Sequence, residues 1–154
     1  MAINRDFIGR SLRSSATYLV GREKIREFAA AIGDNNPIYH DVAAAQANGH
    51  PDLVAPPTFA FVITFRAMVA SFADPVLNLD YSRVVHGEQH FRYSRPLYAG
   101  DEVVVESTID DIKALGINEL INMRQDIKTI DGEHIATTSN ITVSRGTAAV
   151  ESEA

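Results

Sequence analysis

Residues 54–73, VAPPTFAFVITFRAMVASFA, decide how this chain folds. The two prolines suit the approach to a helix and its first turn, and apolar residues fill nearly every later position, with Arg66 as the only charge. A helix that is apolar on all sides has to be surrounded. The interior arginine and the interspersed Ala, Thr and Ser favour a helix buried in protein over one that spans a membrane. The rest of the chain is therefore expected to wrap it.

Strands in the second half of the chain are expected to do the wrapping. Apolar and polar residues alternate over residues 89–94 and 102–109, and two further strands are expected at 117–127 and 135–143. The pair Asp131-Gly132 is the strongest hairpin signal. The fourth strand is expected to carry the following residues on one face: Ile135, Thr137, Ser139, Ile141 and Val143.

The first half of the chain reads mainly as helix. Ile25, Phe28, Ala29 and Ile32 recur at helical spacing, which predicts an amphipathic helix from Arg22 that ends at Gly33. A shorter Ala-rich helix is expected at 42–47. Helices followed by successive antiparallel strands predict an α+β domain whose curved antiparallel sheet wraps around the long central helix. The edges of such a sheet predict a dimer.

Length and composition set the limits. With 154 residues, 45% hydrophobic and 22% charged, the chain is expected to form one domain over 1–146 and a flexible tail over 147–154. A net charge of −6 does not favour nucleic acid or an anionic membrane surface as partner. The absence of cysteine excludes disulfides and thiolate catalysis, and it fits a cytoplasmic protein. The first residues lack the apolar run of a secretory signal, so the mature chain is expected to begin at Met1.

The loop GDNNPIYH, residues 33–40, is the polar cluster with the clearest chemical potential. A carboxylate and an imidazole that share one water are what hydration or dehydration of a double bond needs, since one group activates water and the other handles the second proton. The nearby helix start would add a positive end for an enolate-like oxygen. An Asp/Asn/Pro cluster is also common in loops and caps, so the residues by themselves leave both interpretations open.

Residues 33–38, Gly-Asp-Asn-Asn-Pro-Ile, resemble the motif G-D-x-N-P-[IL]-H of the MaoC-like (R)-specific enoyl hydratase and (3R)-hydroxyacyl-ACP dehydratase family, which has the hot-dog fold. Residues 91–101, FRYSRPLYAGD, resemble the F-x-x-P-V-x-x-G-D strand and turn of the same family. The resemblance implies an acyl thioester substrate and an Asp-His dyad. No cofactor is predicted other than the pantetheine of coenzyme A or acyl carrier protein, which is part of the substrate.

The sequence departs from the family at two catalytic positions. Tyr39 occupies the place of the histidine, and His40 lies one residue late. A phenol with a pKa near 10 is a poor general base at neutral pH. Pro57 stands where catalytic members have a glycine whose amide stabilises the oxyanion, and proline has no N–H to donate.

This combination resembles the non-catalytic, tunnel-type subunits of actinobacterial heterodimeric dehydratases, which carry A-P-x-T-F at this point. The resemblance implies that a catalytic MaoC-like partner supplies the dyad while this chain shapes the acyl channel. Phe61 and Phe65 are further candidates for channel walls, although helix residues fit an ordinary core equally well. The candidate substrate-binding residues are Asn36, Tyr39, Pro57, Thr58, Phe59 and Val62.

Three functions remain open on the sequence. The first is a subunit of a dehydratase or hydratase that is inactive by itself. The second is a self-sufficient homodimeric hydratase that uses Asp34 and His40 as catalytic residues, and the third is a non-enzymatic protein that binds acyl thioesters. Acyl length, carrier type and partner identity are not encoded in any recognisable pattern.

Two weaker signals favour structural roles. The stretch HGEQH at residues 86–90 does not have zinc-helix order and reads as strand, so no metal site is predicted. Arg66, Arg92 and Arg95 would form a patch for the phosphates of a carrier's pantetheine arm if they converged, but solvated arginines are the preferred interpretation.

Overall fold

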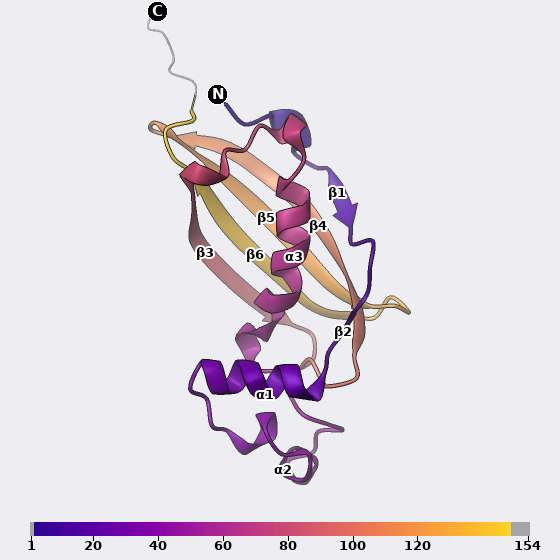
Figure 1. The fold of residues 1–154 in the computed structure, drawn as a ribbon. Helices are drawn as coiled ribbons and strands as arrows, with labels where there is room; N and C mark the ends of the chain where they lie inside the picture. The colour runs from indigo at the N-terminus through magenta and orange to yellow at the C-terminus, as the bar shows by residue number, and fades with distance from the viewer. Residues whose placement is uncertain (1, 149–154) are drawn as a thin grey trace, which may run out of the picture.

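The computed structural model describes residues 2–148. Its centre is one antiparallel sheet that curves around helix α3, with the strand order β1-β4-β5-β6-β3 and β2 paired to β4 (Figure 1). The predicted α+β architecture, a curved sheet wrapped around the apolar central helix, is confirmed. The strands are β1 Ser11–Arg13, β2 Tyr18–Leu19, β3 Val84–Tyr93, β4 Glu102–Leu115, β5 Asn118–Thr129 and β6 His134–Ser144.

Helix α3, Ala60–Phe72, follows a 3-10 turn over Pro57–Phe59. Its buried residues, among them Ile63 and Met68, join two apolar clusters that fill the space between helix and sheet. The expectation that the whole helix is surrounded is wrong for one flank, because Phe65 is 46% and Val69 38% exposed. A single layer of strands covers only part of a helix circumference.

Helices α1, Arg22–Ala31, and α2, Val42–Ala47, lie together beyond one end of the sheet (Figure 1). Helix α1 ends where Gly33 takes a φ of +74°, a conformation that favours glycine. The Asp41 side chain caps α2 by accepting from the amide of Ala43 at 3.0 Å. Both predicted helices are present at their predicted places.

The fourth predicted strand, β6, differs in one detail. Its register against β5 shifts between Ile127 and Lys128, so Ile135 and Ala136 both enter the core. Ile135 therefore does not share the outer face with Thr137. The buried face beyond this bulge is polar and consists of Thr138, Asn140, Thr142 and Ser144.

The N-terminal segment contains strand β1, which the sequence did not predict. It is fixed near its start, where the amide of Ile3 donates to the buried carboxylate of Glu119 at 2.9 Å. At the other end of the chain, Thr147 is buried and the amide of Ala148 donates to the carbonyl of Ile117. The rest of the predicted tail, 149–154, lies outside the described residues. Among helices in the described part, none has the length and apolarity needed to cross a membrane.

Candidate functional site

A cavity of about 370 Å³ lies beside the start of α3. It is bounded by the loop that carries the hydratase-like motif, by the turn before the helix and by the end of β3. Of the predicted site residues, Tyr39 and Pro57 line it. The full lining consists of Tyr39, Val54, Ala55, Pro57, Tyr93, Ser94, Arg95 and Pro96.

Asp34 and His40 do not line this cavity, and the His40 imidazole contacts the backbone of Asp34 and not its carboxylate. The Nε2 atom of His40 lies 2.8 Å from the carbonyl oxygen of Asp34. The Asp34 carboxylate accepts from the amide of Asn36 at 3.0 Å, which is a loop-capping contact. The Asn36 side chain in turn accepts from the amide of Ile38. The catalytic role of Asp34 and His40 and the substrate-binding role of Asn36 therefore stay predictions.

Tyr39, at the histidine position of the motif, is buried. Burial raises the pKa of the Tyr39 phenol, and the nearby Asp34 carboxylate raises it further. The phenol therefore stays protonated at neutral pH. A group that holds its proton this firmly cannot abstract one from substrate or water.

Tyr93 contributes a contact that the sequence did not predict. Its hydroxyl donates to the carbonyl oxygen of Pro57 at 2.5 Å. Burial raises the pKa of Tyr93 to about 12, while a backbone hydrogen bond from Ala60 acts in the opposite direction. The phenol oxygen thus lies at the amino end of α3, where a helix offers its free amides and positive dipole. An aromatic residue with a polar tip at the end of a strand was the only available signal.

The other predicted substrate-binding residues have ordinary surroundings. Phe59 is fully buried and packs edge-on against Phe28, with ring centroids 5.4 Å apart. Val62 is half-buried against the same apolar cluster, and Thr58 is exposed. Phe59 therefore lies in the core between α1 and α3, and binding by Thr58 and Val62 stays a prediction.

Arg95 is a structural residue in this arrangement. Its guanidinium bonds Asp101 at 2.8 and 3.0 Å and Glu133 at 2.9 and 3.1 Å. These two acids raise the pKa of Arg95, and the arginine lowers the pKa of Glu133. Arg66 and Arg92 lie on α3 and β3. The description of Arg95 as a solvated arginine is wrong, because its donors are already occupied.

The histidines of residues 86–90 lie on strand β3, as expected. His86 packs against the ring of Phe61, and Nε2 of His90 lies 3.0 Å from a carboxylate oxygen of Glu88. Within residues 2–148, no three His, Asp or Glu side chains gather in a way that would hold a metal ion.

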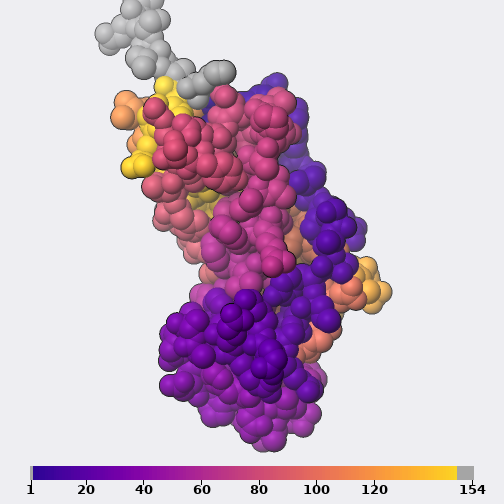
Figure 2. Space-filling model, viewed as in Figure 1, coloured from indigo at the N-terminus to yellow at the C-terminus, as the bar shows by residue number. Residues whose placement is uncertain are grey.

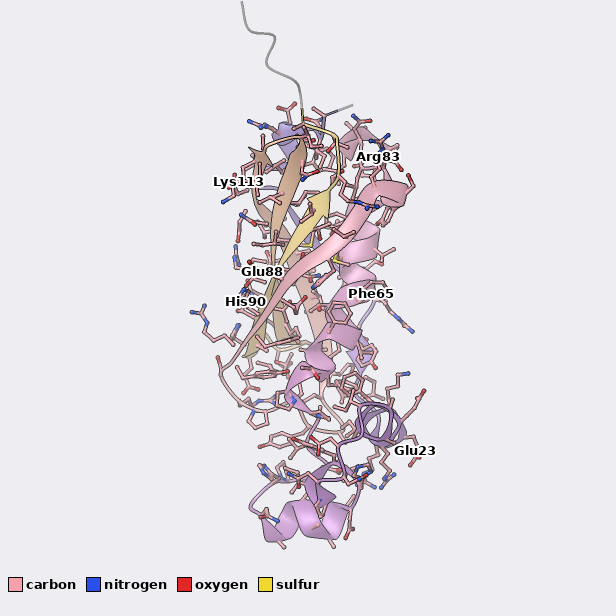
Figure 3. All side chains as sticks on the ribbon, turned by 90° about the vertical axis from the view of Figure 1, so that its left-hand side faces the viewer. Glu23, Phe65, Arg83, Glu88, His90 and Lys113 are labelled. Atoms are coloured by element: carbon pink, nitrogen blue, oxygen red, sulfur yellow. The ribbon has the colours of Figure 1, made fainter. Side chains whose placement is uncertain are left out.

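Strand β3 borders the cavity and leaves one edge open. Within the described chain it pairs only with β6, so a ten-residue edge has no strand partner. Figure 3 shows Glu88 and His90 on this strand, with Phe65 of α3 on the same side of the molecule. An open edge beside exposed apolar residues is typical of a surface that pairs with another chain. A chain paired there would border the Tyr93 end of the cavity.

Comparison with protein families gives a match over residues 6–138 to the model described as "FAS1-like, dehydratase domain region". A UPF0336 protein of Streptomyces coelicolor is 53% identical over 137 residues, which cover 89% of this chain and 91% of that protein. Its name carries no activity.

Solved structures give the same fold. The C-terminally truncated HadBC complex of Mycobacterium tuberculosis, a (3R)-hydroxyacyl-ACP dehydratase, contains a chain with a TM-score of 0.82 and 26% identity, which covers 90% of this chain and 97% of that one. A MaoC-like dehydratase has a TM-score of 0.84 and 30% identity over 90% of this chain and 42% of that protein. The predicted hot-dog fold is confirmed.

Proposed function

The chain belongs to the FAS1-like dehydratase-domain family, and on this premise we propose that it is one subunit of a (3R)-3-hydroxyacyl-thioester dehydratase or enoyl hydratase. A catalytic MaoC-like partner supplies the Asp-His dyad, and this chain forms part of the acyl channel. The substrate is an acyl thioester of coenzyme A or acyl carrier protein, with the pantetheine arm as its only cofactor-like part. The cytoplasmic location stays a prediction.

The observation that carries the proposal is which hydrogen-bonding groups are present and already occupied at the start of α3. In hydration, water adds to the β-carbon, a proton reaches the α-carbon, and the thioester oxygen carries negative charge in between. Pro57 offers no amide to that oxygen, and the Tyr93 oxygen already has a backbone hydrogen bond with Ala60 at the start of α3. Tyr39 is a protonated phenol in the position of the base. At these two positions the chain therefore has neither the glycine amide nor the histidine of the motif.

The open edge of β3 supports the proposal that a partner subunit binds. A hot-dog subunit that pairs with β3 would extend the sheet and cover Phe65 and Val69, two exposed apolar residues of α3. The relative named HadBC is itself a complex of subunits, and it resembles this chain over nearly its whole length. The cavity beside Tyr93 would then lie near the seam between the two chains, where a dyad from the partner can face it.

The test is hydration of crotonyl-CoA by the purified chain and by the chain co-purified with a hot-dog protein that carries an intact G-D-x-N-P-x-H motif. We expect negligible turnover by the single chain and enzymatic turnover by the pair. Turnover by the single chain that disappears in both Asp34→Ala and His40→Ala would overturn the proposal and establish a self-sufficient hydratase. Thioester binding with no turnover in either sample would instead favour the non-enzymatic function.

The seam is tested with two exposed apolar residues. Phe65→Asp, beside the open edge, is expected to reduce the activity of the pair at least tenfold by weakening association, since it places a charge in an apolar contact. Leu115→Asp is the matched control, because Leu115 is more exposed but lies at the β4–β5 hairpin. Equal effects of the two variants would argue against pairing at β3.

A further inference from the structure

A serine and a histidine meet at the rim of the cavity beside Tyr93. Ser94, the residue after β3, lines this cavity, and its hydroxyl oxygen lies 2.7 Å from Nδ1 of His134, the first residue of β6. The amide of Ser94 donates to the carbonyl of Ile135 at 2.8 Å, so the pairing of β3 with β6 continues through the serine. In Figure 2 this end of the molecule is where the violet N-terminal helices meet the magenta start of α3. The contact between serine and imidazole is therefore fixed by the backbone of two strands.

The other ring nitrogen of His134 is held by two further groups. Its Nε2 atom lies 2.8 Å from the hydroxyl oxygen of Thr137, and that hydroxyl donates to the carboxylate of Asp126 at 2.6 Å. Thr137 and Asp126 are opposite each other on the paired strands β6 and β5. Arg124 also donates to Asp126, so the carboxylate has a fixed position. The imidazole is thus oriented from both sides.

This chain of contacts determines which nitrogen of His134 carries the proton. A carboxylate only accepts hydrogen bonds, so the hydroxyl proton of Thr137 points to Asp126 and the Thr137 oxygen is left to accept. The neutral imidazole therefore has its proton on Nε2. Its Nδ1 atom then has a free lone pair, and the Ser94 hydroxyl donates to it. A serine bonded to the basic nitrogen of an oriented imidazole is the arrangement that activates a nucleophile.

Tyr39 supplies a free hydrogen-bond donor in the same cavity. Burial raises the pKa of the Tyr39 phenol, which therefore keeps its proton, and the hydroxyl forms no hydrogen bond with any residue of 2–148. A proton without a partner is available to an oxygen that develops negative charge. The other walls leave room for a small acyl group and are largely apolar, with Val54, Ala55, Pro57 and Pro96 among them.

We propose that Ser94 is the nucleophile of an esterase site that hydrolyses small carboxylic esters, with His134 as general base and the Tyr39 phenol as donor to the oxyanion. The Ser94 oxygen adds to the ester carbonyl carbon while its proton passes to Nδ1 of His134. The bond from that carbon to the alcohol oxygen breaks, and His134 gives the proton to the departing alcohol. Water then adds to the acyl carbon through the same histidine, which releases the carboxylic acid and restores Ser94. Thr137 and Asp126 are positioning residues.

This reaction differs from the proposed dehydratase role. Hydrolysis breaks a bond at the acyl carbon, whereas hydration and dehydration change the bond between the α- and β-carbons. It uses side chains of this chain alone and needs no dyad from a partner. The inference therefore goes beyond the proposed function and does not depend on it.

The experiment is hydrolysis of p-nitrophenyl acetate by the purified full chain, followed through the absorbance of nitrophenolate. Acetate has neither a double bond nor a β-hydroxyl, so a dehydratase activity cannot contribute. We expect saturable turnover and, in samples quenched with acid, an acetyl group on the peptide that contains Ser94. Ser94→Ala should lower kcat/KM by about a hundredfold or more. The matched control is Ser82→Ala, which should leave the rate unchanged, because the Ser82 hydroxyl also has a partner at 2.7 Å but that partner is the Asp80 carboxylate.

Two further positions test the donor and the positioning residue. Tyr39→Phe keeps the ring and removes the donor, so kcat should fall by about tenfold or more while KM changes little. Thr137→Val should also lower kcat, whereas Thr137→Ser keeps the hydroxyl and should restore it. A purely structural role of Thr137 would not give this difference between two variants that fold equally well. Circular dichroism and thermal unfolding establish that each variant folds.

Absence of turnover by the natural chain would overturn the proposal, and so would a Ser94→Ala protein as active as the natural chain. An acetyl group found only on another residue would overturn it as well. If Ser94→Ala does not fold, the natural chain is treated with diisopropyl fluorophosphate, which forms a stable phosphoester with an activated serine. Phosphorylation of Ser94 with loss of turnover supports the proposal, and unmodified Ser94 after this treatment overturns it.

Discussion

The two flanks of α3 differ although the helix is apolar nearly all round. On the β3 flank the sheet ends in an open edge, Phe65 is exposed, and the inner face of β6 carries buried polar residues such as Thr138 and Asn140. On the β1 flank the floor is apolar, with Ile63, Val103 and Val105 buried, and Arg66 of α3 is exposed at the rim. The sequence of an apolar helix therefore does not determine which elements pack against each of its flanks. The elements beside the helix decide which of its residues stay exposed on each flank.

Gln125 lies under the helix between the two flanks, and its replacement is expected to give the largest loss of stability. Its buried amide donates to the carbonyl of Thr64 at 2.9 Å and to Ser107 at 3.0 Å, so it joins helix to sheet. Gln125→Ala leaves a cavity and removes two buried hydrogen bonds, at a cost of about 2–4 kcal/mol. Urea unfolding measures the loss. Gln46→Ala, an exposed glutamine on α2, should change stability by less than about 0.5 kcal/mol.

If Gln125→Ala were as stable as Gln46→Ala, the Gln125 amide would not be the contact that fixes α3 to the sheet between the two flanks.

Tyr93 on the β3 flank predicts an intermediate effect that depends on pH. Burial raises its pKa from 10.0 to about 12, so the folded state keeps a proton that the unfolded state loses first. The stabilisation is complete below pH 10 and is lost as pH rises through about 12, on the order of 2 kcal/mol in total. The measurement is the free energy of unfolding between pH 9 and 12.

Tyr93→Phe should flatten this part of the pH profile, since it removes the titrating group. Tyr98→Phe is the control, because the Tyr98 hydroxyl contacts His50 and not α3. An unchanged slope in Tyr93→Phe would mean that the phenol does not sit in the buried position at the helix start.

The sequence predicts the helices and long strands well, but it does not predict which side chains meet on the two flanks of α3. Residues 57–73 read as an apolar helix because hydrophobicity is a local pattern, and the alternation of β4 and β5 is local as well. The bond between Tyr93 and Pro57 joins residues 36 positions apart, and no local pattern encodes it. Strand β1 has three residues, too few to show a period. The cavities between α3 and the N-terminal segment depend on which residues of α3 face β1, and this follows only from the packing of the whole domain.

The same reasoning applies to the candidate site. The departures at Tyr39 and Pro57 were visible in the sequence because a motif defines those positions. The pairing of Arg95 with Asp101 and Glu133 was not, since Glu133 lies 38 residues away on another turn. Motifs locate residues along the chain, whereas the partners that occupy their hydrogen-bonding groups come from distant segments.

The smallest expected effect comes from two neighbouring threonines on β6, and it has opposite signs. The hydroxyl of Thr138 is fully buried on the inner face and has no hydrogen-bond partner among the described residues. Thr138→Val keeps the shape and removes an unsatisfied polar group, so it should stabilise the fold by about 1 kcal/mol. The hydroxyl of Thr137, on the outer face, donates to Asp126 at 2.6 Å and contacts His134 at 2.8 Å. Thr137→Val should therefore destabilise by a similar amount.

Chemical unfolding of the two valine variants side by side measures both signs. Destabilisation by Thr138→Val would mean that the inner hydroxyl has a partner, such as an internal water, and that the polar face of β6 is satisfied. The β3 flank would then be more polar than the β1 flank, but it would carry no unsatisfied hydroxyl that lowers the stability of the fold. Stabilisation by Thr138→Val would mean that the polar inner face of β6 lowers the stability of the fold. Since this face lies beside the β3 edge that we assign to a partner, the chain would then keep it for a reason other than its own folding.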